Sequence, residues 1–371
     1  MSALDDRLGN IRLTLVVGSG GVGKTTLAAA LGAAKAAAGE RCLVMTFDPS
    51  LRLKDALGVD RVDRGEEIRV ASADGELFAS LLDARKTFDR LVERYSPDAA
   101  SRERILNNRY YDHLAGHLGG ILEYMAVERL YEVATEGRYD RVILDTPPTR
   151  QAIDFLEAPQ RIVSFLDSGA LRIALRPWFG DDGELKVTSG LGFVGRQLEG
   201  FLDRIVGMQL LRDMSEFFRA FEPMFGGFRS RAEKVEKLLG ASQTSFILVA
   251  GPGRERIPDA LFFARRLKEA GYRLGPIVVN RVHPEFALSE GAIPEEAAGR
   301  ELFHWLGRRH QDGLADLRKL LPQNQALVAM PLEAGEPTDL GSLNAMGRRL
   351  LDKLAKAKIS LDDFAAMQQS S

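Results

Sequence analysis

Cysteine is nearly absent from this chain of 371 residues, in which Cys42 is the single example. One thiol cannot form an intrachain disulfide, so the sequence favours a reducing compartment. No C-x-x-C pair occurs either, which excludes a zinc ion clamped by paired cysteines. We therefore expect no zinc.

An excess of charge of one sign is also missing. The formal net charge is −2 at pH 7, and hydrophobic residues make up 45% of the chain. Near-neutral charge removes the electrostatic basis for general nucleic-acid binding, so no nucleic-acid partner is expected. Length and composition together are typical of a water-soluble globular protein with room for a sizeable core.

Long hydrophobic runs are lacking as well. The longest, such as Phe246–Ala250, have the length of a strand and are too short to span a bilayer. The first residues, MSALDDRLGN, have neither the basic nor the apolar region of a secretory signal. These absences predict a cytoplasmic protein without an integral membrane segment.

What the chain does contain is an alternation of short β-rich runs and longer helical patterns. This alternation is typical of parallel sheets built from strand–helix–strand units. The predicted fold class is α/β, with a doubly wound, mostly parallel sheet. The predicted strands are Arg12–Val17, Arg41–Phe47, Arg141–Leu144, Ser245–Ala250, Pro276–Asn280 and Ala326–Met330.

The long gaps between these strands are predicted to hold helices and no further strands. In GELFASLLDARKTFDRLVERYS, which starts at Gly75, apolar residues recur at three- and four-residue steps and predict an amphipathic helix. A second helical pattern covers 121–137. We expect residues 1–371 to form a single domain, in which insertions at about 75–136 and 151–241 build a helical subdomain. The tail 360–371 is predicted to be disordered.

Residues 18–25 read GSGGVGKT and match G-x-x-x-x-G-K-[ST] in full, between a β-rich strand and an Ala/Leu helix. Glycines in such a loop let successive N–H groups turn toward a phosphate. Lys24 is predicted to neutralise phosphate charge, and Thr25 to bind Mg²⁺. The predicted nucleotide-binding residues of this segment are Gly18, Ser19, Gly20, Gly21, Val22, Gly23, Lys24, Thr25 and Thr26.

Two aspartates fit the same chemistry, because ligands of open α/β sheets collect at the carboxyl ends of the strands. Asp145 ends YDRVILD and is predicted to bind Mg²⁺ through a water molecule. Asp48 ends CLVMTFD and is placed to orient or deprotonate the attacking water. The alternative for each is a helix N-cap or a turn. Lys24, Asp48 and Asp145 are the predicted catalytic residues.

Two later residues are predicted to hold the base of the nucleotide. Asn280 ends the strand PIVVN, and its amide offers both a donor and an acceptor. A turn-forming role is the alternative for this asparagine. Pro331 follows ALVAM and is predicted to help shape the same pocket.

GSGGVGKTT, followed by FDPSLRLKDALG and ILDTPPTRQAIDFLEAP, resembles the ArsA-type anion-transporting ATPases and the related targeting factors for tail-anchored membrane proteins. These belong to the MinD/ParA class of P-loop ATPases with a deviant Walker A motif. The resemblance implies an ATP-gated clamp, in which two subunits close over ATP and their helical subdomains rearrange. It also implies that Asp48 lies in switch I, that 145–149 form switch II, and that Asn280 contacts the base.

One departure from the family concerns the loop. Its pattern is G-K-G-G-x-G-K-T, whose first lysine crosses the dimer to the partner's phosphates, and this chain has Ser19 there. Either a lysine-bearing paralogue completes a heterodimer, or a homodimer uses an arginine. Arg52 and Arg150 are the candidates, and solvated surface charge is the alternative role for both.

Other departures concern metal and client. Arsenite is held by several thiolates, so a single Cys42 disfavours an arsenite-triggered pump motor. His113 and His117 share a helical face without a matched ligand and are predicted to be structural. The stretch 191–228 is rich in Phe and Met, and such faces suit varied apolar partners. In the targeting-factor relatives corresponding helices form a groove for a hydrophobic membrane segment, whereas the simpler interpretation is a packed core.

The sequence therefore predicts a Mg²⁺-dependent ATPase that acts as a nucleotide-switched dimer with ATP as its nucleotide. Its partner is a second copy or a paralogous ATPase, and a hydrophobic protein client is a further expected partner. One alternative is an ATP-binding chaperone or regulatory subunit that barely hydrolyses ATP. Another is a small-molecule kinase on the same fold.

Overall fold

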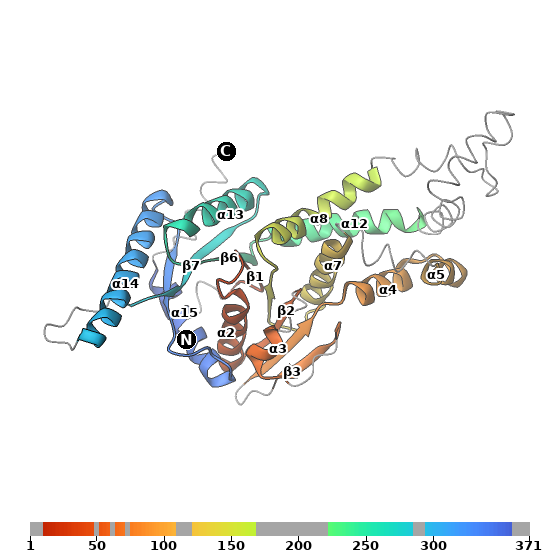
Figure 1. Ribbon diagram of the computed structural model, residues 1–371. Coiled ribbons are helices and arrows are strands. Elements are labelled where there is room, and N and C mark those ends of the chain that lie inside the picture. Colours follow the sequence, from red (N-terminus) through yellow and green to blue (C-terminus); the bar gives the residue numbers. More distant parts are fainter. Residues whose placement is uncertain are drawn as a thin grey trace, which may run out of the picture. The chain divides into compact units, whose positions relative to one another are not determined.

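The computed structural model describes residues 10–47, 52–59, 64–70, 75–108, 121–167, 222–284 and 294–357. The chain divides into two compact units (Figure 1). The first contains Met1–Leu82, Glu132–Ile153 and Leu238–Ser371, and the second contains Asp83–Tyr131 and Asp154–Lys237. The chain thus leaves the first unit twice and returns to it each time.

The first unit is built on an eight-stranded sheet in the order β3-β4-β2-β5-β1-β6-β7-β8. Neighbouring strands run parallel, except that β3 is antiparallel to β4. The predicted α/β fold class with a mostly parallel sheet is confirmed. The strands are β1 (Leu13–Gly18), β2 (Arg41–Thr46), β3 (Glu67–Val70), β4 (Glu76–Leu81), β5 (Arg141–Asp145), β6 (Thr244–Ala250), β7 (Leu274–Val282) and β8 (Leu327–Pro331).

Two helices, α2 (Lys24–Ala37) and α15 (Leu340–Lys356), pack against each other and share one core with a face of the sheet (Figure 1). Small residues permit this approach. A Cβ on Gly347 of α15 would lie 2.0 Å from the carbonyl oxygen of Ala30 in α2. A side chain at that position would therefore push the two helices apart. Short α3 (Arg52–Leu57) also contacts α2.

A second helical layer includes α13 (Ile257–Glu269), which contacts β1, β6 and β7. Its Phe263 and Leu267 are buried but lie outside the α2–α15 core. Along β6, Phe246 and Leu248 alternate with the residues that face α2 and α15, as a strand period of two requires. Long α14 (Pro294–Leu320) contacts β7 and the 3₁₀ turn η3 (Arg254–Arg256).

One sequence prediction was wrong. The chain between β2 and Ala84 forms strands β3 and β4 in addition to the short helix α3. The sequence predicted no strand in this part of the chain and a helix from Gly75 onward. Leu77 and Leu81 are four residues apart, and this spacing fits two periods of a strand as well as one helical turn. Leu77, Ala79 and Leu81 are all buried, which is the pattern of alternate residues on one face of β4. The predicted helix begins only at α4 (Ala84–Tyr95).

Three charged side chains meet where β2 and β5 begin, at the edge opposite the carboxyl ends of the strands. Glu40 lies 3.0 Å from the ammonium of Lys35 and 2.6 Å from Nε of Arg141. Burial raises the pKa of Glu40, but hydrogen bonds and charges of Arg141 and Lys35 outweigh it, and the net pKa lies below the ordinary value. The carboxylate therefore compensates two buried cations.

The second unit is helical in its described part. It contains α4, α5 (Ala99–Leu106), η2 (Glu222–Met224) and most of α7 (Ile121–Thr135), α8 (Thr149–Asp167) and α12 (Phe225–Gly240). The hydroxyl of Tyr124 donates to the carbonyl of Phe228, 3.2 Å away, and Arg231 pairs with buried Glu128. These contacts tie α7 to α12 within one small core.

The Phe- and Met-rich stretch 191–228 is described only from residue 222 onward. Met224 and Phe228 are buried there and belong to the core of the second unit. The rest of that stretch, the two histidines His113 and His117, and the tail 360–371 lie outside the described residues. Among the helices that the structure describes, none has the length and apolar composition that a membrane span requires.

Candidate functional site

The loop between β1 and α2 is shaped by glycines with positive φ angles. Gly18, Gly21 and Gly23 have φ of 147°, 75° and 89°. At Gly18 a Cβ would lie 2.0 Å from the carbonyl oxygen of Val249, and at Gly23 it would lie 2.5 Å from Nδ2 of Asn280. Larger residues are excluded by both conformation and space, so the loop can wrap closely around an anion at the start of α2.

Lys24 is the first residue of α2, and its side chain folds back across the loop. Its ammonium donates to the carbonyl of Ser19, 2.9 Å away, and the residue is only 7% exposed. A positive charge is thus held inside the curve of the loop, where Coulomb attraction to a phosphate is least screened. The Ser19 side chain turns elsewhere, because its hydroxyl donates to Asp259 in the first turn of α13.

Asp145 ends β5 beside this loop and is 1% exposed. Its Oδ2 accepts hydrogen bonds from two threonines, Thr25 of α2 at 2.6 Å and Thr46 of β2 at 3.1 Å. The β2–β5 register pairs Thr46 with Asp145, which explains why three elements bring their oxygens to one point. Thr146 follows, and its hydroxyl donates to the carbonyl of Val16 in β1, which fixes the end of β5.

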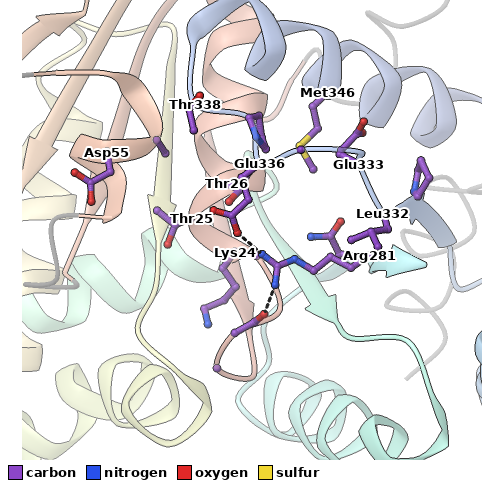
Figure 2. Close-up of a pocket in the computed structure, with 18 of the residues that line it drawn as sticks. Lys24, Thr25, Thr26, Asp55, Arg281, Leu332, Glu333, Glu336, Thr338 and Met346 are labelled. Atoms are coloured by element: carbon purple, nitrogen blue, oxygen red, sulfur yellow. Dashed lines mark hydrogen bonds and ion pairs between the residues drawn. The ribbon is translucent and has the colours of Figure 1, made fainter. Parts of the chain in front are cut away.

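A cavity of about 750 Å³ opens in the first unit along this loop (Figure 2). One side consists of loop and α2 residues, among them Lys24, Thr25 and Thr26. The opposite side is formed by Asn280, Arg281, Pro331 and the segment from Leu332 to Thr338 that joins β8 to α15. Its volume is in the range of pockets that enclose a small-molecule ligand.

Residues 11–178 match the family model for the anion-transporting ATPases. Protein Rv2184c of Mycobacterium tuberculosis is 28% identical over 91% of this chain and 75% of its own length. ATPase GET3 of Kluyveromyces lactis is 24% identical over 94% of this chain and 93% of its own length. ATPase ARSA1 of Chlamydomonas reinhardtii is 28% identical over 60% of this chain, which spans only 33% of that relative.

Over residues 11–178 the chain is similar to the anion-transporting ATPases. The predicted resemblance is thereby confirmed, and it supports an ATPase that binds a nucleotide. The site described above lies on the elements that such enzymes use for phosphate, namely the loop after β1 and the carboxyl ends of neighbouring strands.

Most of the predicted site residues come together at this cavity. Gly20, Gly21, Gly23, Lys24, Thr25, Thr26, Asn280 and Pro331 all line it. Gly18 and Val22 do not line it; Val22 is buried, and its carbonyl accepts a hydrogen bond from Asn280. Asp48 lies outside the described residues, as β2 ends at Thr46. Arg52 starts α3 and Arg150 follows the start of α8, but their side chains are not among those described.

Asn280 is held at the end of β7 by its own amide. Nδ2 donates to the carbonyl of Val22, 2.9 Å away. Oδ1 is buried and has no hydrogen-bond partner within the described part of the chain. A buried amide oxygen without a partner is costly, unless a ligand supplies a donor. The N6 amino group of adenine has such a donor.

An oxygen-only donor set is what Mg²⁺ prefers, and Thr25 and Asp145 provide it. In the described residues no group of three His, Cys, Asp or Glu side chains forms a cage for a metal ion. Mg²⁺ does not need such a cage, because it keeps several waters and takes the rest of its ligands from substrate phosphates. The hydroxyl of Thr25 and the carboxylate of Asp145 therefore fit a magnesium–nucleotide complex.

Cys42 is buried in β2, as predicted, and does not line the cavity. Burial, with a smaller contribution from the charge of Glu40, raises the pKa of Cys42 to about 12. Its thiol therefore stays protonated near pH 7, whereas a soft metal or arsenite needs a thiolate. One buried thiol cannot supply the several thiolates that bind arsenite or a soft metal ion.

Sequence reasoning missed three parts of this site. Arg281 was overlooked because it follows Asn280 in a strand, where neighbouring side chains normally face opposite ways. From the region after β8 the sequence analysis predicted only Pro331 as a site residue and missed the segment from Leu332 to Thr338. The Gly and Pro residues of LEAGEPT do indicate a loop at the end of a strand. Thr46 carried no motif, and only the register of β2 with β5 reveals its contact with Asp145.

Proposed function

We propose that this protein is a Mg²⁺-dependent ATP hydrolase that works as a dimeric nucleotide switch. The observation that carries the proposal is the contact of 2.6 Å between Thr25 Oγ1 and Asp145 Oδ2, next to a glycine loop that holds Lys24. These three residues put a cation and two oxygen ligands where a triphosphate would end. The oxygen donors and the loop amides support ATP and Mg²⁺ as the ligands.

Each residue has a separate task in the proposed mechanism. The amides of the loop and the ammonium of Lys24 stabilise the negative charge that develops on the phosphates during transfer to water. The Thr25 hydroxyl and the Asp145 carboxylate would hold Mg²⁺, the latter through a water. The metal would neutralise phosphate charge there. Asp48 orients the attacking water.

Asn280 and Pro331 hold the base in this proposal. The open acceptor at Asn280 Oδ1 selects adenine, whose N6 donates, over guanine, whose O6 accepts. A ligand that leaves a buried polar group of the site without a hydrogen bond binds much more weakly than one that supplies the bond.

Nucleotide state is transmitted through the segment after Asp145. Helix α8 begins at Thr149, and the chain passes from the first unit to the second within it. A movement of the segment after Asp145 can thus be transmitted along α8 to the helical unit. Such order changes of a switch segment are a common route from phosphate chemistry to a larger rearrangement. An apolar protein client of the helical unit is part of this proposal.

Dimerisation is proposed because two ATP-loaded faces have to be brought together around charge that Ser19 does not neutralise. A second copy of the chain or a lysine-bearing paralogue completes the site. Arg52 and Arg150 are the candidate cations of the homodimer.

The test is phosphate release from ATP by the purified chain, with Mg²⁺ and with excess EDTA. We expect Mg²⁺-dependent release that rises more than linearly with protein concentration, as assembly requires. Lys24→Ala and Asp48→Asn should each lower turnover by about a hundredfold or more. Binding of ATP without hydrolysis by the chain alone, with activity restored by a lysine-bearing paralogue, would favour the regulatory-subunit alternative. Phosphate transfer to an added metabolite would favour a kinase.

A further inference from the structure

The backbone of Arg281 departs from the strand that contains it. Its φ is 60°, the left-handed region, and it is the one non-glycine with a positive φ among the described residues. The pairing of β7 with β8 is also irregular here, with a register shift between Val279 and Val282. A left-handed residue at a bulge is strained for a side chain other than glycine, and such strain gathers at functional sites.

The consequence of this bend is that two successive side chains face one cavity. In a regular strand Asn280 and Arg281 would point to opposite faces. Both instead line the cavity beside the phosphate loop. Figure 2 shows the Arg281 side chain reaching from β7 toward the loop that leads into Lys24.

The guanidinium of Arg281 lies against the phosphate loop itself. Its Nη1 donates to the carbonyl of Gly21 at 3.3 Å, and its Nε lies 4.0 Å from the place that a Cβ on Gly23 would occupy. Lys24 and Arg281 are the basic side chains that line the described part of this cavity. A second cation is therefore held within reach of the loop that would bind the phosphates.

On its other side Arg281 meets Glu336. Nη2 lies 3.5 Å from Oε1 of Glu336, in the segment that joins β8 to α15 (Figure 2). The Glu336 side chain is 85% exposed, so this ion pair is solvated and adds little stability. A phosphate is a better partner, since a guanidinium can bind two of its oxygens at once.

We propose that Arg281 is a nucleotide-binding residue, which exchanges the carboxylate of Glu336 for a phosphate group when a nucleotide enters the cavity. This inference rests on the proposed function, because it needs a phosphate at the loop. Glu336 then competes with the nucleotide for one guanidinium. The contact between Glu336 and Arg281 is thus present in the free protein and is lost when a nucleotide binds.

The main experiment measures the dissociation constants of ATP and ADP by calorimetry, with Mg²⁺, for the full chain and its variants. Arg281→Gly removes the guanidinium and keeps a residue that adopts the positive φ without strain. We expect it to weaken both nucleotides by about tenfold, which is typical of one lost charge-assisted contact. Arg281→Asn, which also tolerates this conformation, should behave in the same way.

Glu336→Gln removes the competitor and should tighten nucleotide binding by about threefold, as expected for an exposed ion pair. In the Arg281→Gly background the same substitution should have no effect. Glu269→Gln is the control, since Glu269 forms exposed ion pairs with Arg265 and Arg266 and does not line the cavity. It should leave the dissociation constant within about twofold of that of the unmodified chain.

Salt dependence gives a second readout. Loss of a cation from the binding site should flatten the dependence of nucleotide affinity on ionic strength. An unaltered slope and unaltered affinity in Arg281→Gly would overturn the inference, as would additive effects of the two substitutions. These results differ from a failure of the proposed function, in which the unmodified chain itself binds neither ATP nor ADP.

Discussion

The hydroxyl of Ser19 donates a hydrogen bond to the carboxylate of Asp259, with 3.2 Å between Ser19 Oγ and Asp259 Oδ2. The loop position that is a lysine in the family pattern is thus tied to α13 of the same chain. Its side chain is an exposed neutral donor, and an exposed hydrogen bond of this kind contributes little free energy.

We therefore expect Ser19→Ala to change the dissociation constant of ATP and the rate of phosphate release by less than about threefold, as loss of one weak neutral hydrogen bond implies. Asp259→Asn, which keeps an acceptor for the hydroxyl, serves as its control. Steady-state hydrolysis and calorimetry on both variants check this. A loss of tenfold or more in Ser19→Ala would mean that the hydroxyl itself contacts the nucleotide.

Thr25 and Thr46 donate to the same oxygen of Asp145, yet only Thr25 is expected to bind the metal. Thr25→Val should abolish the gain in ATP affinity that Mg²⁺ provides, and leave metal-free binding within about threefold, because the loop amides remain. Thr46→Val is the matched control and should keep the response to Mg²⁺. Titrating ATP with and without EDTA distinguishes the two. Equal losses in both variants would argue that the threonines only position Asp145.

Asn280→Ala should lower ATP affinity by about tenfold and narrow the preference for ATP over GTP, since the acceptor that adenine needs is removed. The substitution also removes the hydrogen bond from Asn280 to the carbonyl of Val22 in the loop, and this loss should weaken the binding of ATP and GTP equally. The ratio of the ATP and GTP dissociation constants therefore isolates the contact with the base. A ratio unchanged by the substitution would contradict a role for Asn280 in reading the base.

Glu40 offers a test of stability against pH. Its pKa is lowered in the folded chain, so the stabilisation is fully present above the unfolded value of 4.5 and is lost as the pH falls through the folded value. Glu40→Gln should lower the free energy of unfolding by about 3 kcal/mol at pH 7, because it removes a carboxylate that pairs with two buried cations, Arg141 and Lys35.

This deficit should persist down to about pH 5 and shrink below the unfolded value as the carboxylate of the unmodified chain becomes protonated. Urea unfolding at a series of pH values measures it. The control is Glu76→Gln, which breaks two ion pairs between exposed side chains, with Arg41 and with Arg69, and should cost less than about 1 kcal/mol. A deficit independent of pH would mean that packing, not charge, is lost.

The phosphate loop could be predicted because its signal is local. Strand, glycines, Lys-Thr and helix follow one another within some twenty residues, and each one restricts the conformation of the next. Strands β2, β5, β6, β7 and β8 were also predictable, since buried parallel strands are short apolar runs. Strands β3 and β4 were not predictable. The spacing of Leu77 and Leu81 fits a strand and a helix equally well, and only the pairing of β4 with β2 decides between them.

The site was predicted as far as motifs extend. Asp145 and Asn280 end apolar strands, and such ends converge at one edge of a parallel sheet. Arg281 could not be predicted, because its orientation depends on a bulge against β8, a strand far along the chain. The contribution of Glu336 depends in turn on that orientation.

The close packing of Gly347 against the backbone of Ala30 restricts the relative movement of two helices. It joins α2, which starts at the glycine loop, to α15, which follows the segment on the opposite side of the cavity, so these two helices cannot slide past one another at this contact. Amide protons in the interior of α2 and α15 should therefore be among the slowest of the chain to exchange.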